Sequence, residues 1–191
     1  MTMLTGNEHF MYNGSPINRL LLDFWAWQAS DLLSNTLRGA LAEYIVATAL
    51  DIDTASEREN WYEYDLLYGD TRIEVKSSAY LQSWERDGFS RISFSISPSR
   101  PYTTSLWNDD DISRHSDIYV FCLFASKDRD TADPMQLEQW EFYVVKTADI
   151  DATLGSQRSV SLSTIKTLPH ICCTYDDLKR AIDKLSAGEA L

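Results

Sequence analysis

The stretch Tyr62–Ser78 places the strongest constraint on what this chain can fold into. Two runs rich in aromatic and β-branched residues flank Gly69 and Asp70. A glycine in the first central position suits a type II′ two-residue turn, so the segment predicts a β-hairpin. A turn centred there pairs Leu66 with Ile73 on one face. Because side chains alternate between faces, the same register sets two acidic residues opposite each other on the other face.

These two acidic residues are Asp65 and Glu74. Carboxylates directly opposite each other, with Cβ atoms roughly 5 Å apart, destabilise a hairpin unless a positive charge lies between them. A divalent cation would supply that charge. Glu63 and Lys76 form the next pair on the same face, and the alternative interpretation is a structural face on which Lys76 only forms an ion pair with Glu63.

Asp65 followed by Glu74-Val75-Lys76 resembles the signature of the PD-(D/E)XK nucleases, the restriction-endonuclease-like superfamily. Tyr64 stands where that signature usually has proline, a departure that the superfamily tolerates. The resemblance extends over roughly residues 31–147. It implies an α/β protein with the restriction-endonuclease-like fold, in which a central mixed β-sheet is flanked by helices.

The resemblance also implies a metal site. Asp65 and Glu74 would be the primary ligands of Mg²⁺ or Mn²⁺, ions that prefer hard oxygen donors, with the carbonyl of Val75 as a further ligand. A glutamate on the helix before the hairpin, here Glu43, would complete the site directly or through water. Lys76 would position the attacking water or stabilise developing negative charge.

Residues 31–50 carry the pattern of an amphipathic helix, with Ser30 or Ser34 available as the N-cap. No basic residue lies at helical spacing from Glu43, which favours a carboxylate directed at something other than an ion pair. The alternative is an ordinary exposed glutamate. The residues expected on the buried stripe are Leu37, Leu41, Tyr44, Ile45 and Thr48.

Further residues are expected to support the site or bind substrate. Gln82 resembles a site-supporting glutamine of some superfamily members, and Ser77 could contact phosphate or satisfy a strand end. Arginines that follow the hairpin are the candidates for phosphate contacts, with scattered surface positions as the alternative; they are Arg86, Arg91 and Arg100.

The rest of the chain predicts one domain at residues 19–191, preceded by an irregular arm at residues 1–18. Trp25 and Trp27 favour core or interface packing over base stacking. Strict alternation at residues 91–97 predicts a strand, and the apolar run at 117–124 predicts a central strand covered on both faces. Thr174 is expected to cap a closing helix with Leu178, Ile182 and Leu185 on one stripe.

Charge and composition limit the function. The net charge of −12 opposes DNA binding unless the basic residues cluster, since such affinity comes from neutralising phosphates. The three cysteines fit neither a disulfide framework nor a metal-ligand spacing. No apolar run spans a bilayer and no signal peptide is visible, so we expect a cytoplasmic protein without membrane contact.

The sequence therefore predicts a Mg²⁺-dependent endonuclease that hydrolyses phosphodiester bonds of DNA, of the restriction or phage-defence type. Double-stranded DNA is the expected partner, and a homodimer is left open. Two alternatives remain: a catalytically silent nuclease-fold module that binds nucleic acid or protein, and an accessory subunit of a nuclease complex.

Overall fold

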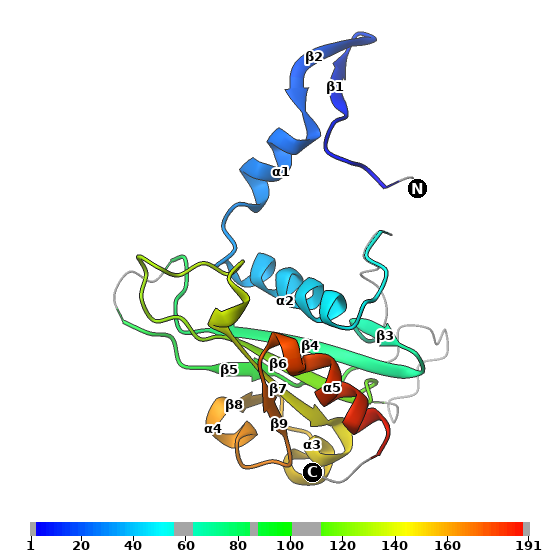
Figure 1. The fold of residues 1–191 in the computed structure, drawn as a ribbon, viewed down its shortest axis with the longest axis vertical. Coiled ribbons are helices and arrows are strands. Elements are labelled where there is room, and N and C mark those ends of the chain that lie inside the picture. Colours follow the sequence, from blue (N-terminus) through cyan, green and yellow to red (C-terminus); the bar gives the residue numbers. More distant parts are fainter. Residues whose placement is uncertain (1–2, 56–62, 85–87, 101–111, 189–191) are drawn as a thin grey trace.

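A five-stranded mixed sheet forms the centre of the molecule, with strand order β3-β4-β6-β7-β9 (Figure 1). This computed structural model describes residues 3–55, 63–84, 88–100 and 112–188. β4 and β6 run parallel and the other neighbours antiparallel, which confirms the expected α/β class with a central mixed sheet. The strands are β3 (Leu66–Tyr68), β4 (Thr71–Ala79), β6 (Ile118–Phe124), β7 (Trp140–Lys146) and β9 (Ile171–Cys173).

Each face of the sheet has its own hydrophobic core. On one face pack α2 (Asn35–Ala49) and α5 (Tyr175–Ser186). The other face is covered by α3, α4 and a small two-stranded sheet of β5 and β8, and the short 3₁₀ helix η1 directly precedes β7. Their bounds are β5 (Ser93–Ser95), η1 (Leu137–Gln139), α3 (Thr147–Leu154), β8 (Ser159–Ser161) and α4 (Leu162–Ile165). Within the described ranges, no helix is long and apolar enough to span a membrane.

Patterns that depend on short-range periodicity are confirmed. Every residue of β6 is buried, as expected for a strand covered on both faces. The alternating segment at 91–97 buries its three apolar side chains, although only Ser93–Ser95 forms a strand. α5 buries the predicted stripe of Leu178, Ile182 and Leu185, and Thr174 is its N-cap, without a side-chain capping bond.

The hairpin has the predicted register as far as Leu66, which pairs with Ile73. Gly69 has a φ of +57° and Asp70 does not have a positive φ, as a type II′ turn requires. Beyond Leu66 the ladder ends, so the expectation that Asp65 and Glu74 form a ladder pair is wrong. Asp65 instead donates its N–H to the carbonyl of Ile73, at 3.0 Å.

α2 begins at Asn35, one residue after its N-cap Ser34, whose Oγ accepts the N–H of Leu37 at 3.4 Å. The buried face is rotated from the predicted stripe, since Tyr44 is 56% exposed. Small side chains let the helix approach the sheet closely, and the bulky tyrosine lies outside. The buried residues are Arg38, Ala42, Ile45, Val46 and Ala47.

The segment expected to be an irregular arm is ordered, so that prediction is wrong. It forms the antiparallel strands β1 (His9–Tyr12) and β2 (Ser15–Leu20), followed by α1 (Leu21–Ala29). Asn13 and Gly14, at the turn, both have positive φ, the requirement of a type I′ hairpin that Asn-Gly satisfies.

We call residues 3–30 the N-terminal arm. It stands away from the body of the molecule, and neither its strands nor α1 has a buried residue (Figure 1). Trp25 and Trp27 are 37% and 78% exposed, so they do not pack in the core, and the interface and base-stacking interpretations remain.

Arg114 links the segment before β6 to β5 and to the end of α3. Its side chain is 1% exposed and donates to the carbonyls of Ile96, Gly155 and Gln157, each at 2.8 Å. It also forms an ion pair with Asp151, whose side chain is half exposed. The guanidinium therefore holds three separate backbone segments together.

We expect Arg114→Met to lower the free energy of unfolding by about 2–4 kcal/mol, because three carbonyls lose their donor. Asp151→Asn, the matched control, should cost less than about 1 kcal/mol because that partner is exposed. Urea denaturation measures both. Equal losses in the two variants would contradict this role of Arg114.

Candidate active site

The site lies where β3 leaves the edge of β4. β3 pairs with β4 only as far as Ile73, whereas β4 continues to Ala79. On this open side, the Asp65 Oδ2 accepts the N–H of Val75 at 2.8 Å. The N–H and C=O of one strand residue point to the same side, so the carbonyl of Val75 points towards the side on which Asp65 lies.

Asp65 is held across Glu74 by two backbone contacts. Its N–H binds the carbonyl of the residue before Glu74, and its carboxylate binds the N–H of the residue after it. The carboxylate is thereby fixed beside Glu74 although the two residues are not a ladder pair. The contact with the backbone of Val75 thus places the Asp65 carboxylate next to the residue that the sequence sets opposite it.

Lys76 supplies a positive charge to both carboxylates. Its Nζ forms an ion pair with the Oε1 of Glu74 and lies 3.7 Å from the Oδ2 of Asp65. Glu74 and Lys76 alternate with residues that face α2, so both side chains belong to the opposite face of β4. The alternative in which Lys76 forms an ion pair with Glu63 alone therefore does not describe this face.

The pKa values reflect burial and this crowding of charge. Burial raises the pKa of Glu74, and the charge of Asp65 raises it further, against the opposing effect of Lys76. Burial alone would lower the pKa of Lys76, but the charges of Asp65 and Glu74 outweigh it and the net change is upward. Burial followed by the charge of Glu74 raises the pKa of Tyr119 to about 12. Lys76 is thus a cation at neutral pH, suited to stabilise negative charge.

Glu43 contributes charge from the other side of the strand. It is half-buried on α2, and its charge adds to the raised pKa of Glu74. Among the residues that the structure describes, no group of three His, Cys, Asp or Glu side chains is arranged so that it could hold a metal ion. The structure thus brings together Asp65, Glu74 and Lys76, with Glu43 acting on Glu74 through its charge.

The predicted supporting residues differ in their positions. Gln82 is buried and donates from Nε2 to the carbonyl of Ala79 at 3.1 Å, at the far end of the open edge. Ser77 is half-buried on the α2 face of β4. Arg91 and Arg100 are exposed on the segments before and after β5, and Arg86 lies outside the described residues.

Arg38 is the site-supporting residue that sequence reasoning missed. It is 3% exposed and donates to the Oε1 of Gln82 at 3.0 Å, the Oδ1 of Asn35 at 2.6 Å and the carbonyl of Leu33 at 2.8 Å. Burial lowers its pKa to about 10. Arg38 ties the helix that carries Glu43 to the end of β4. A buried arginine on a helix has no local signal, because its partner Gln82 lies on another element.

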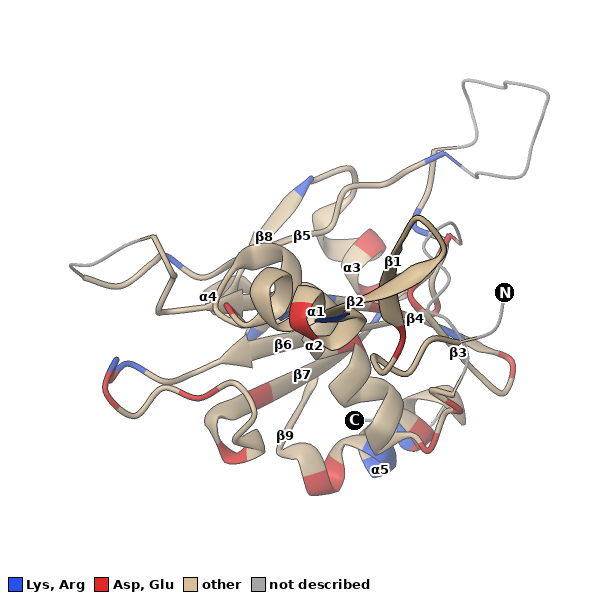
Figure 2. Cartoon of the chain, turned by 90° about the horizontal axis from the view of Figure 1, so that it is seen from above, with Lys and Arg blue, Asp and Glu red and all other residues tan. Residues whose placement is uncertain are grey.

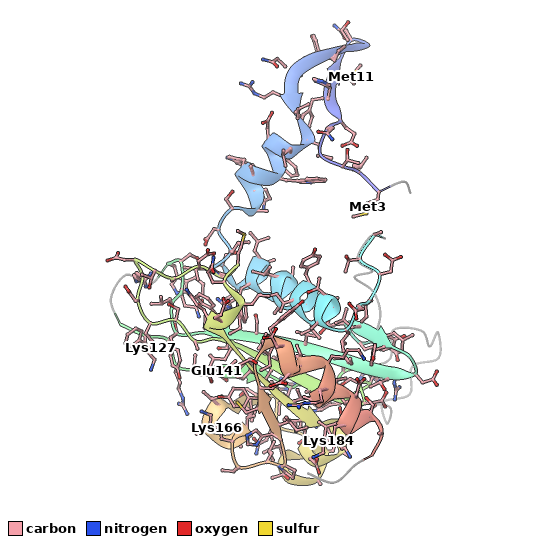
Figure 3. All side chains as sticks on the ribbon, viewed as in Figure 1. Met3, Met11, Lys127, Glu141, Lys166 and Lys184 are labelled. Carbon is pink, nitrogen blue, oxygen red and sulfur yellow. The ribbon has the colours of Figure 1, made fainter. Side chains whose placement is uncertain are left out.

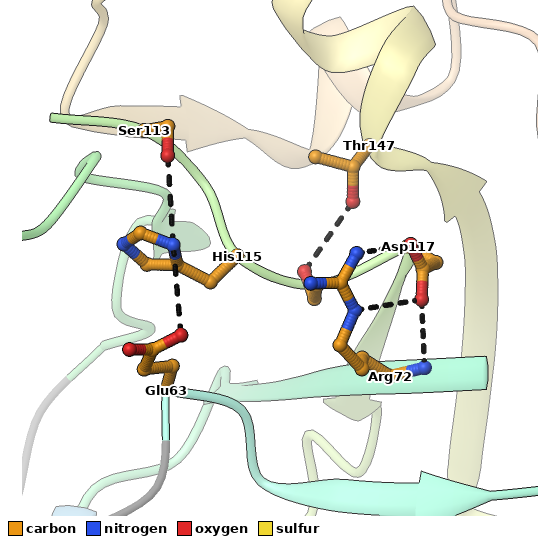
Figure 4. Close-up of polar contacts among 7 residues, drawn as sticks. Glu63, Arg72, Ser113, His115, Asp117 and Thr147 are labelled. Carbon is orange, nitrogen blue, oxygen red and sulfur yellow. Dashed lines mark hydrogen bonds and ion pairs between the residues drawn. The ribbon is translucent and has the colours of Figure 1, made fainter. Parts of the chain in front are cut away.

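A second group of contacts fixes the sheet next to the site (Figure 4). The carboxylate of Asp117 accepts the backbone N–H of Arg72 at 2.9 Å and two bonds from its guanidinium. These bonds lower the pKa of Asp117. The N–H of Asp117 returns a bond to the carbonyl of Arg72 at 2.8 Å. Together they fix the parallel register that places Glu74 beside Tyr119.

His115 joins the two chain segments that precede Asp65 and β6. Its Nδ1 lies 3.9 Å from the Oε2 of Glu63 (Figure 4). Its Nε2 is 2.9 Å from the carbonyl of Ser99. Ser116 contacts Thr147 through their hydroxyl groups at 3.3 Å. Residues 112–117, which precede β6, are thus attached to the segment that carries Asp65.

One comparison with known proteins gives a match. The sequence model of a protein family, described as Bacteriophage T4 endonuclease IV, matches residues 17–164. This range contains Glu43, Asp65, Glu74 and Lys76. No curated protein and no solved structure matches the chain.

The charge crowding leads to a prediction about stability. The pKa of Glu74 is raised in the folded protein, so protonated Glu74 favours folding. This contribution to the free energy of unfolding is fully present below the ordinary pKa of glutamate, and it is lost as the pH rises through the raised pKa. We therefore expect Glu74→Gln to raise the melting temperature at pH 8 in EDTA. Glu138→Gln, at an exposed position on η1, should leave it nearly unchanged. A lower melting temperature for Glu74→Gln than for wild type would show that the ionised Glu74 stabilises the fold.

Proposed function

The chain belongs to the bacteriophage T4 endonuclease IV family, and we propose that it is an endonuclease that hydrolyses phosphodiester bonds of DNA, with Asp65, Glu74 and Lys76 as its catalytic groups. The observation that carries the proposal is their convergence at the open edge of β4. Asp65 satisfies the edge of β4, but a second half-buried acidic group beside it and a charged lysine in contact with both are not needed for that, whereas functional sites commonly hold perturbed ionisable groups.

We assign the site to the PD-(D/E)XK type. Support comes from an aspartate at the start of a hairpin, a Glu-x-Lys sequence on the next strand, and a preceding helix that carries Glu43. The central mixed sheet between helices agrees with a restriction-endonuclease-like fold. Tyr64 in place of proline is the departure from the signature.

The donor groups fit a hard divalent cation, Mg²⁺ or Mn²⁺. Mg²⁺ is commonly bound by one or two carboxylates together with water and substrate phosphate, so Asp65 and Glu74 suffice as side-chain ligands. The carbonyl of Val75 would be a further ligand, and Glu43 would act through water. When bound, the ion would neutralise phosphate charge and lower the pKa of water.

Lys76 would act on the substrate itself. Its ammonium group donates hydrogen bonds and carries a full charge, so it would stabilise the negative charge that develops on phosphate oxygens or orient the attacking water. The pKa of Lys76 is raised, which makes it a donor and not a proton acceptor in this state. Asp65 would remain fixed by the N–H of Val75 during the reaction.

Double-stranded DNA is the proposed substrate, in a restriction or phage-defence role. The exposed Arg91 and Arg100, together with Arg86, are the candidates for phosphate contacts.

The net charge of −12 favours a second candidate function, a nuclease-fold module or accessory subunit that does not cut alone. Cleavage by the pure protein separates the two.

We expect the pure protein to cut plasmid DNA in millimolar Mg²⁺ and not in EDTA. Lys76→Met and Glu74→Gln should each lower the rate by about 100-fold or more, because transition-state charge loses its stabilisation. Lys166→Met, at an exposed position after α4, should cut like wild type. Cleavage by Lys76→Met at the wild-type rate would refute the assignment, and no cleavage by wild type would favour the accessory role.

Metal binding can be tested without activity. At ten times its dissociation constant, Mg²⁺ should raise the melting temperature by about 3–6 °C, since a ligand of the folded state stabilises it. Asp65→Asn should remove this gain, whereas Asp183→Asn, a surface change on α5, should keep it. An undiminished gain in Asp65→Asn would show that this carboxylate is not a ligand.

A further inference from the structure

The N-terminal arm carries many exposed apolar side chains. Figure 3 shows Met3 and Met11 on the arm, and Met11 lies far from the body of the molecule. Ten large apolar residues of the arm are exposed; they are Met3, Leu4, Phe10, Met11, Tyr12, Ile17, Leu22, Phe24, Trp25 and Trp27. Single exposed apolar residues are ordinary, but such a concentration marks an interaction surface.

The arm has a defined shape without a core of its own. The N–H groups of Leu21 and Leu22 bind the carbonyls of Glu8 and Gly6 at 2.8 and 2.9 Å. A side chain at Gly6 would come within 3.0 Å of the ring of Trp25, so the segment before β1 is packed against α1. An isolated two-stranded hairpin and a nine-residue helix are each marginal in water. A partner that covers the arm would supply the missing burial.

The exposed area is that of one side of a stable protein interface. Aromatic side chains present about 150–250 Å² each, and the five of the arm are 37–78% exposed, so they offer roughly 500 Å². The aliphatic and methionine side chains add roughly as much. One side of a standard interface buries about 800 Å², and the largest apolar patch on a monomer is about 300–600 Å².

Charge selects the kind of partner. The arm has two acidic residues, Glu8 and Asp23, and one basic residue, Arg19, so its net charge is −1 whereas the whole chain has −12 (Figure 2). A single basic residue cannot neutralise a run of phosphates, which argues against nucleic acid. Two copies of an acidic chain repel each other over most of their surfaces, and the nearly neutral arm is where they can meet.

One basic and one acidic side chain, Arg19 and Asp23, border an apolar hollow on the arm. The hollow has a volume of about 310 Å³ and is lined by Phe10, Ile17, Arg19, Asp23, Phe24 and Trp27. Under two-fold symmetry, the same patch on two chains contacts itself, so Arg19 of one copy can face Asp23 of the other. This self-complementarity favours a second copy over an unrelated protein.

We propose that the N-terminal arm is the contact surface of a two-fold symmetric homodimer, in which the apolar side chains of two arms cover each other. The inference rests on exposure, area and charge in the arm and does not depend on the proposed nuclease activity. Trp27 is the expected centre of the contact, because it is the most exposed of the apolar residues that line the hollow.

Sedimentation equilibrium of the full chain tests the proposal. Wild type should have twice the 21.9 kDa mass of one chain at micromolar concentration. Trp27→Glu should raise the dimer dissociation constant by about 30-fold or more. Met135→Glu adds the same charge at a residue that is 67% exposed outside the arm, and should remain dimeric.

A charge exchange tests the symmetry of the contact. Arg19→Asp and Asp23→Arg should each weaken the dimer alone, and a mixture of the two variants should form a heterodimer in which both charge pairs are restored. Monomeric wild type, or a dimer insensitive to Trp27→Glu, would overturn the proposal. So would monomeric wild type whose DNA binding is weakened by Trp27→Glu, since nucleic acid would then be the occupant.

Discussion

The hydrogen bond from the N–H of Val75 to the carboxylate of Asp65 is the contact on which the candidate site depends. A strand edge leaves its backbone groups unpaired, which is costly when they are buried and invites pairing with other chains when they are exposed. Here β3 ends early and a side chain takes the place of a backbone partner. The acidic group that we propose as a metal ligand is thereby fixed by the same contact that satisfies the edge of β4.

That arrangement costs stability. Glu74 is half-buried next to Asp65, and its raised pKa means that its ionised form opposes folding. Lys76 offsets part of this cost as a counterion within the protein. Arrangements of this kind persist where function requires them, because a less charged site would be more stable but chemically inert. The positive charge that the hairpin sequence requires is thus present in the chain itself, whether or not a metal ion joins it.

Local periodicity explains what could be predicted from the sequence. The hairpin register, the buried strand β6 and the apolar stripe of α5 follow from side-chain alternation and helical spacing. The exposure of Tyr44 and the burial of Arg38 depend on how α2 packs against β4 and on the distant Gln82, so neither was predictable locally. The N-terminal hairpin had a local signal in the turn residues Asn13-Gly14. Its strands bury no residue, so no buried face in the sequence marked them as strands.

The distribution of charge separates two kinds of contact on this molecule. Any contact with DNA must overcome the acidic body, and it must use local positive charge such as Lys76 and the arginines near β5. Such binding weakens steeply with salt because it releases counterions. The arm is nearly neutral and apolar, so its contacts gain from screening of the repulsion between acidic chains. Salt would therefore act in opposite directions on the proposed DNA contact and on the proposed contact between arms, which lie in separate regions of the molecule.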